Sequence, residues 1–203
     1  MVSDPATTGR FLVLDGPDGS GTTTHARLLH EALTREGRDC LLTAEPTDGP
    51  VGSGIRTMLR EGAALSPADL QKLFVDDRAW HVREVVEPAI ARGAVVVCDR
   101  YVPSTIAYGE ALGLDRAWLE ELNKNFVHPS ALILLLPPLD VCMERLRRRP
   151  AQDAMEDRAL QERVHAAYHR YAAAHPDVIV IENTGTKDET AATILAAVRR
   201  ALN

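Results

Sequence analysis

Glycine and hydroxyl side chains are concentrated in the stretch DGPDGSGTTTH, residues 15–25. Residues 16–23 follow the phosphate-binding pattern G-x-x-x-x-G-K-[ST], except that Thr22 stands where the pattern has lysine. Glycines let backbone N–H groups turn inward, and a helix beginning at about Thr22 adds its positive end, so phosphate can bind without a side-chain cation. The hydroxyl of Thr23 falls at the position that ligates magnesium in such loops.

An ordinary glycine-rich turn between a strand and a helix is the alternative explanation for this stretch. Its place directly after an apolar run of strand length favours phosphate binding. The residues predicted to bind phosphate are Gly16, Pro17, Asp18, Gly19, Ser20, Gly21, Thr22, Thr23 and Thr24.

The missing lysine raises the question of which cation replaces it. One well-placed cation in phosphoryl transfer is worth ~10³-fold or more in rate. Arg147, Arg148 and Arg149 are adjacent in the segment LRRRP, and RRRPAQDAMED is predicted to form a loop between two helices. A solvated basic helix end explains any one of these arginines, whereas the cluster favours phosphate binding.

The elements that must position these residues alternate along the chain. Five near-continuous apolar runs have strand length: RFLVLD (10–15), CLLTAE (40–45), AVVVCD (94–99), ALILLL (131–136) and DVIVIEN (177–183). Amphipathic helical patterns separate them, which predicts a parallel sheet covered by helices on both faces. We expect one α/β domain over residues 10–203, after a disordered tail over residues 1–9.

Three of the apolar runs are followed by segments rich in glycine, proline, hydroxyls and charges. These segments are GPDGSGTTT, EPTDGPVG and DRYVPSTIAYG. Ligands of parallel sheets bind beyond the carboxyl ends of the strands. The three segments therefore converge on one predicted site.

Composition excludes several classes of function. The 203 residues carry 23 basic and 29 acidic side chains, a net charge of −6, which argues against a sequence-independent nucleic-acid binder. The three cysteines form no C-x-x-C pair, so buried thiols are favoured over metal ligands. No apolar stretch approaches the length of a membrane span, and we expect a cytoplasmic protein without a signal peptide.

Taken in order, five segments resemble the thymidylate kinase family. They are LVLDGPDGSGTTT, EPTDGPVG, LFVDDRAWHV, DRYVPSTIAYG and RRRPAQDAME, within about residues 10–171. The resemblance implies a P-loop nucleoside monophosphate kinase with a lid at about residues 147–157. It implies phosphoryl transfer from ATP–Mg²⁺ to dTMP, giving dTDP and ADP for dTTP biosynthesis, in a homodimeric enzyme.

The same resemblance assigns catalytic roles. Asp99 and Arg100 would organise magnesium and the acceptor phosphate, and Asp18 would lie near the acceptor and the metal. A fixed guanidinium fork suits a phosphate held between donor and acceptor. The predicted catalytic residues are Asp18, Asp99, Arg100, Arg147, Arg148 and Arg149, and the predicted metal ligands are Thr23, Asp18 and Asp99.

For the acceptor base, the resemblance points to a helix face. Phe74 and Arg78 are four residues apart on that face, where Phe74 would stack on thymine and Arg78 would bind its carbonyl edge. Core packing is the alternative for Phe74, because most helical phenylalanines are buried in the core. The predicted substrate-binding residues are Glu45, Pro46, Phe74, Arg78, Arg100, Tyr101, Ser104, Thr105 and Tyr108.

The chain also departs from the family pattern at four places. Thr22 replaces the lysine, Ala44 replaces an arginine before Glu45, and Gly109 replaces a glutamine. The loop pattern D-R-x-E reads DAME at residues 153–156. These departures leave two alternatives open: a kinase for another or modified pyrimidine monophosphate, and a nucleotide-binding protein without turnover.

Overall fold

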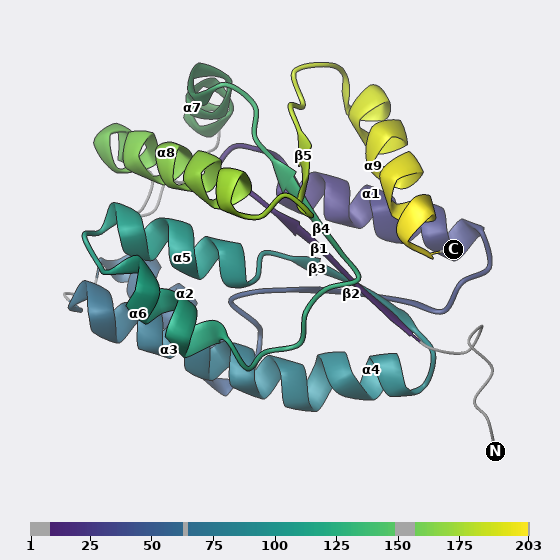
Figure 1. Cartoon of the computed structure of the whole chain (residues 1–203), viewed down its shortest axis with the longest axis horizontal. Helices are drawn as coiled ribbons and strands as arrows, with labels where there is room; N and C mark the ends of the chain where they lie inside the picture. Colours follow the sequence, from purple (N-terminus) through teal and green to yellow (C-terminus); the bar gives the residue numbers. More distant parts are fainter. Residues whose placement is uncertain (1–8, 63–64, 149–156, 203) are drawn as a thin grey trace.

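The computed structural model describes residues 9–62, 65–148 and 157–202. The predicted tail lies almost wholly outside these ranges, as do Arg149 and most of the predicted lid. A five-stranded parallel sheet in the order β2-β3-β1-β4-β5 forms the centre of the described chain (Figure 1). The strands are β1 (Arg10–Asp15), β2 (Cys40–Ala44), β3 (Val95–Asp99), β4 (Ala131–Leu135) and β5 (Ile179–Ile181). The predicted α/β class with five parallel strands is confirmed.

Helices connect the strands and cover both faces of the sheet (Figure 1). They are α1 (Thr22–Arg35), α2 (Pro50–Glu61), α3 (Pro67–His81), the π-helical η2 (Val82–Val86), α4 (Glu87–Ala91), α5 (Val102–Ala111), α6 (Arg116–Asn123), α7 (Leu139–Arg147), α8 (Arg158–Ala174) and α9 (Lys187–Leu202). Before β3, the helices α3, η2 and α4 follow one another without a break. None of the helices in the described ranges has the length and apolar character needed to cross a membrane.

Alternation along β1 divides the core between the two faces. Leu12 and Leu14 join a buried cluster with α1 and α9, whereas Phe11 and Val13 join another with η2 and α4. Successive strand side chains point to opposite faces, so a strand that is apolar throughout is buried on both. A third cluster packs α5, α6 and α8 together. The layers hold the carboxyl ends of β1, β2 and β3 side by side.

Two helices near those strand ends begin at capping side chains. Ser66 precedes α3, and its hydroxyl accepts the Asp69 N–H at 3.1 Å, with Pro67 in the first turn. Asp157 caps α8 in the same way, through the Leu160 N–H at 3.1 Å. Such caps satisfy N–H groups that have no partner within the helix. They fix where α3 and α8 start, and both helices carry side chains that reach the site.

Candidate active site

A buried carboxylate, Asp15, joins the end of β1 to the start of α5. Its oxygens accept the hydroxyls of Ser104 at 2.7 Å and Tyr168 at 2.8 Å, and the backbone N–H groups of Gly16 and Tyr101, both at 2.8 Å. Burial raises the pKa of Asp15, while Arg100 and these hydrogen bonds oppose the rise. Asp15 thus links the glycine-rich loop to the β3–α5 connection and fixes their relative positions.

The glycine-rich loop has room only for glycine at two positions. A Cβ at Gly16 would lie 2.4 Å from the carbonyl oxygen of Leu135, and one at Gly19 would lie 2.4 Å from that of Cys142. Gly21 precedes α1 with a φ of 94°, a left-handed conformation that favours glycine. α1 then begins at Thr22, as the sequence predicts, so its N-terminus faces the loop.

Arg145 of α7 contacts the carbonyl groups at the end of this loop. Its guanidinium donates to the carbonyl oxygens of Gly19 at 3.3 Å, Ser20 at 3.2 Å and Asn183 at 2.9 Å. The side-chain amide of Asn183 also donates to the Ser20 carbonyl, at 2.6 Å. Sequence reasoning missed both residues, because Arg145 belongs to an arginine-rich helix end and Asn183 lies far along the chain.

The predicted lid arginines occupy a different environment. Arg147 and Arg148 both pair with Glu144, at 2.7 and 2.9 Å, and their side chains are 60% and 76% exposed. Arg149 lies outside the described residues. A catalytic role for these arginines therefore stays a prediction.

Thr23 and Asp99 meet where the loop passes the end of β3. The Thr23 hydroxyl donates to Asp99 Oδ2 at 2.5 Å. Asp99 is 7% exposed, and its Oδ1 has no hydrogen-bond partner among the described residues. A hydroxyl and a carboxylate with an uncommitted oxygen suit Mg²⁺, which takes few protein ligands and completes its shell with water and phosphate oxygens. The described residues form no group of three or more His, Cys, Asp or Glu that could hold a metal by itself.

Arg100 follows Asp99 in a left-handed backbone conformation, with a φ of 70°. Such a conformation is uncommon for a side chain larger than glycine, and it occurs often at functional sites. The guanidinium donates to the Gly16 carbonyl at 3.1 Å and the Ser104 hydroxyl at 3.2 Å, and it pairs with Asp18. The second oxygen of Asp18 accepts from Gln161 at 3.0 Å. Asp18 and Arg100 thus form one unit beside the loop.

A cavity of about 160 Å³ opens next to this unit. It is lined by all nine predicted substrate-binding residues: Glu45, Pro46, Phe74, Arg78, Arg100, Tyr101, Ser104, Thr105 and Tyr108. Phe74 is half-buried in its wall and is absent from the three core clusters that the described residues form. Asp18, Leu59 and Gln71 complete the lining, and sequence reasoning had not assigned the last two to the site.

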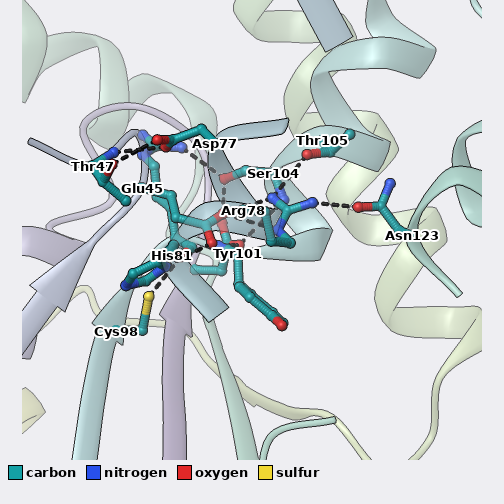
Figure 2. A network of polar contacts seen from close by, with 12 residues as sticks. Glu45, Thr47, Asp77, Arg78, His81, Cys98, Tyr101, Ser104, Thr105 and Asn123 are labelled. Carbon is teal, nitrogen blue, oxygen red and sulfur yellow. Dashed lines mark hydrogen bonds and ion pairs between the residues drawn. The ribbon is translucent and has the colours of Figure 1, made fainter. Parts of the chain in front are cut away.

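Arg78 is held at the cavity wall by a buried polar network (Figure 2). Its Nε donates to Glu45 at 2.9 Å, its Nη2 donates to Thr105 at 3.0 Å, and its Nη1 donates to Asn123. A buried guanidinium requires such partners, because an unpaired buried charge is costly. Asn123 escaped sequence reasoning, since it lies 45 positions from Arg78 and follows no recognisable motif.

The same face of α3 holds the β2–α2 connection (Figure 2). Asp77 accepts the backbone N–H of Thr47 at 2.7 Å and its hydroxyl at 2.6 Å. His81 contacts Glu45 Oε1 at 3.0 Å through Nδ1 and the Thr43 hydroxyl at 2.8 Å through Nε2. These buried contacts fix Glu45 and the residues after it against the cavity.

Two further cavities flank the loop. One, of about 400 Å³, is lined by Thr23, Asp99, Ala44 and Arg56 among others. The other, of about 260 Å³, is lined by Gly21, Thr24, Arg145 and Lys187 among others.

Gly109, which stands where the family pattern has glutamine, packs closely against Leu119. A Cβ at that position would lie 2.7 Å from both methyl groups of Leu119. Leu119 of α6 therefore fills the space into which a side chain at position 109 would project.

Comparison with known proteins places these features in a family. The sequence profile described as thymidylate kinase matches residues 14–194. The chain is 36% identical over 200 residues to a probable thymidylate kinase of Pyrococcus horikoshii, covering 96% of this chain and 98% of that protein. It is 40% identical over 173 residues to the thymidylate kinase of Thermomicrobium roseum, covering 82% of each. It is 41% identical over 180 residues to that of Bordetella petrii, covering 85% and 86%.

Proposed function

The chain belongs to the thymidylate kinase family, and on that premise we propose how its residues bind dTMP and transfer a phosphoryl group from ATP to give dTDP. The observation that carries the proposal is the 160 Å³ cavity, which gathers every residue expected to bind the acceptor. Family membership does not favour the two alternatives, a kinase for another monophosphate and a protein without turnover.

The acceptor binds in this cavity with its base over Phe74 and its phosphate at Arg100. An aromatic ring in a cavity wall offers a stacking surface, and the neighbouring Arg78 offers a donor to a base carbonyl. Gly16, Ser104 and Asp18 already fix the side chain of Arg100. Its guanidinium group can therefore bind the phosphate without losing further conformational freedom. A phosphate that is already ionised needs no general base.

The donor phosphates are proposed to bind at the loop and the N-terminus of α1, through backbone N–H groups between Gly19 and Thr23 other than that of Ser20, which donates to the Pro17 carbonyl at 3.1 Å. Thr23 and Asp99 would hold Mg²⁺, which neutralises charge on the phosphate oxygens when bound. The 260 Å³ cavity beside Gly21 and Lys187 gives the rest of the donor nucleotide a place to bind.

Charge stabilisation falls to arginines in place of the absent lysine. Arg145 donates to two loop carbonyls, and a cation there polarises their peptide groups, among them the Ser20–Gly21 peptide whose N–H belongs to Gly21. Among the described residues, Arg147 and Arg148 are held by exposed ion pairs with Glu144, which contribute about 0–1 kcal/mol, so these side chains can turn towards bound nucleotide. With Arg149, they are proposed to bridge the moving phosphoryl group.

Coupled ADP release tests this proposal directly. Purified protein is assayed with ATP against dTMP, dUMP, dCMP and dGMP, with and without magnesium. We expect turnover that requires magnesium and is fastest with dTMP. Binding of dTMP without turnover would exclude the kinase, and faster turnover of another monophosphate would reassign the acceptor.

Assembly and location are part of the same proposal. We expect a homodimer formed through the helical segment of α3, η2 and α4, in a cytoplasmic enzyme that binds neither nucleic acid nor membrane. Light scattering on the purified protein measures the oligomeric state, and a monomer at micromolar concentration would contradict the dimer.

A further inference from the structure

Gln71 of α3 is a buried amide without a partner. Its side chain is 0% exposed, and among the described residues neither its Oε1 nor its Nε2 has a hydrogen bond. Burying an amide without partners costs free energy that an apolar side chain of the same size would not. An amide kept under these conditions indicates a partner that binds from outside the chain.

The cavity is where such a partner would bind. Gln71, Phe74 and Arg78 are spaced i, i+3 and i+7, so they share one face of α3, and all three line the cavity. Gln71 and Arg78 therefore lie on either side of Phe74 along the helix. A pyrimidine stacked on Phe74 would have its polar groups within reach of both.

Arg78 can form hydrogen bonds with only part of the polar edge of a pyrimidine. The edge of thymine presents an acceptor, a donor and an acceptor in sequence: O2, the N3–H and O4. A guanidinium has no acceptor, so Arg78 cannot pair with the N3–H. In addition, each of its three nitrogens already donates to Glu45, Asn123 or Thr105.

Three other residues of the cavity wall have their acceptor oxygens engaged elsewhere, whereas the buried Tyr108 hydroxyl, like the Gln71 amide, has no hydrogen bond among the described residues. Ser104 bonds with Asp15 and Tyr168, and both oxygens of Asp18 bond with Arg100 or Gln161. The oxygens of Glu45 pair with Arg78 and His81.

We propose that Gln71 is a specificity-determining residue that pairs with the imide edge of the acceptor base. Its Oε1 accepts the N3–H and its Nε2 donates to an adjacent carbonyl. The terminal torsion of a glutamine is broad, so the amide can turn its two groups onto that edge. The proposal rests on the function proposed above and names a further residue for it.

Gln71→Met tests the role, because methionine keeps the unbranched length and removes the amide. Calorimetry is expected to show dTMP affinity falling roughly tenfold to a hundredfold, the effect of one or two hydrogen bonds. Affinity for a non-hydrolysable ATP analogue should not change. The melting temperature of the free protein should rise by about 2–4 °C, since an unsatisfied buried amide is gone.

A matched control is available on the same helix. Lys72 is exposed, and its one ion pair within the described part of the chain is with Asp69, at 3.3 Å on the surface, so Lys72→Met should change neither dTMP affinity nor melting temperature. The same substitution one residue away thus separates an effect of the amide from an effect of methionine on α3.

A second test changes the ligand as well as the residue. A 3-deaza analogue of dTMP is a 4-hydroxy-2-pyridone, with C–H in place of the N3–H and a hydroxyl in place of the 4-carbonyl, and it should bind the wild-type protein at least roughly tenfold more weakly than dTMP does. In Gln71→Met the difference between the two ligands should shrink, because the partner of the N3–H is absent while any effect of the 4-hydroxyl is unchanged. If Gln71→Met fails to fold, Gln71→Leu replaces it, and the comparison of the two ligands on wild-type protein still stands.

The outcomes separate this inference from the function on which it rests. Unchanged dTMP affinity in Gln71→Met, with or without a lower melting temperature, overturns the role of Gln71. Equal binding of dTMP and the 3-deaza analogue to wild-type protein overturns it as well. Wild-type protein that does not bind dTMP would instead remove the proposed function itself.

Discussion

The two sides of the active site hold their charged groups in opposite ways. On the acceptor side, the side chains of Arg78 and Glu45 are 1% and 4% exposed and are locked into one network. On the donor side, Arg147 and Arg148 are exposed and share a single glutamate. Recognition of the base therefore relies on fixed groups in a dry environment, whereas the charge for phosphoryl transfer is supplied largely from the surface.

This difference follows from what each side must do. A cavity that selects one base needs donors and acceptors whose positions are fixed before binding, and buried networks provide that rigidity. Groups that stabilise a moving phosphoryl need to reach it only when both nucleotides are bound. Arg100 belongs to both sides, because it lines the cavity and contacts the loop through the Gly16 carbonyl.

The largest expected effect is therefore at the residue shared by the two sides. Arg100→Ala should reduce kcat by ~10³-fold or more, because the acceptor phosphate loses its cation. Steady-state kinetics measure the loss, and circular dichroism checks that the chain stays folded. Arg116 has a similar exposure, 26% against 22%, but lies outside the cavity, so Arg116→Ala should retain activity. Wild-type rates in Arg100→Ala would refute its role.

The lid arginines come next and probe the donor side alone. Replacing Arg147, Arg148 and Arg149 together by alanine should lower kcat by about 10³-fold at saturating ATP and magnesium, while dTMP affinity is retained. The control removes three exposed arginines elsewhere, Arg35, Arg199 and Arg200, and should leave kcat near normal. If the triple lid variant turns over normally, Arg145 would be assigned the positive charge that replaces the absent lysine.

A smaller effect is expected at the base. Phe74→Ala should weaken dTMP binding by about 1–3 kcal/mol, the contribution of one stacked ring, and should leave affinity for an ATP analogue unchanged. Calorimetry with both ligands measures the two affinities. Lower thermal stability with unaltered dTMP affinity would mean that Phe74 serves the core after all.

Sequence reasoning succeeded where local patterns carry the information. The five apolar runs predicted the five strands, of which the three central ones, β1, β3 and β4, are buried on both faces and so cannot be polar. The segments after β1, β2 and β3 converge because parallel strands end at one edge. The predicted substrate residues, which the resemblance to the family supplied, belong to such segments or to one helix face.

It failed where the partner of a polar residue is remote in sequence. Asp15 bonds with Tyr168, 153 positions away, and Glu45 contacts His81, 36 positions away. No periodicity within either segment indicates such a pair. Gln71 was missed for a related reason, since a polar residue in an amphipathic helix is expected at the surface. Only the packing of α3 against its neighbours shows that it is buried.

The smallest effect is predicted at Thr22, which stands where the phosphate-binding pattern has lysine. Thr22 is 4% exposed at the start of α1, and in the proposed mechanism its hydroxyl is one of several donors around the phosphates. Thr22→Ala should therefore lower kcat by less than about tenfold, since the loss of one neutral hydrogen bond is worth about 0.5–1.5 kcal/mol. Loop amides, Arg145 and the lid arginines all remain in this variant. The decisive measurement is kcat for Thr22→Ala beside the triple lid variant at saturating ATP and magnesium. A large loss in Thr22→Ala with a near-normal triple variant would reverse the assignment, and the loop itself would then carry the charge stabilisation that we ascribe to the arginines.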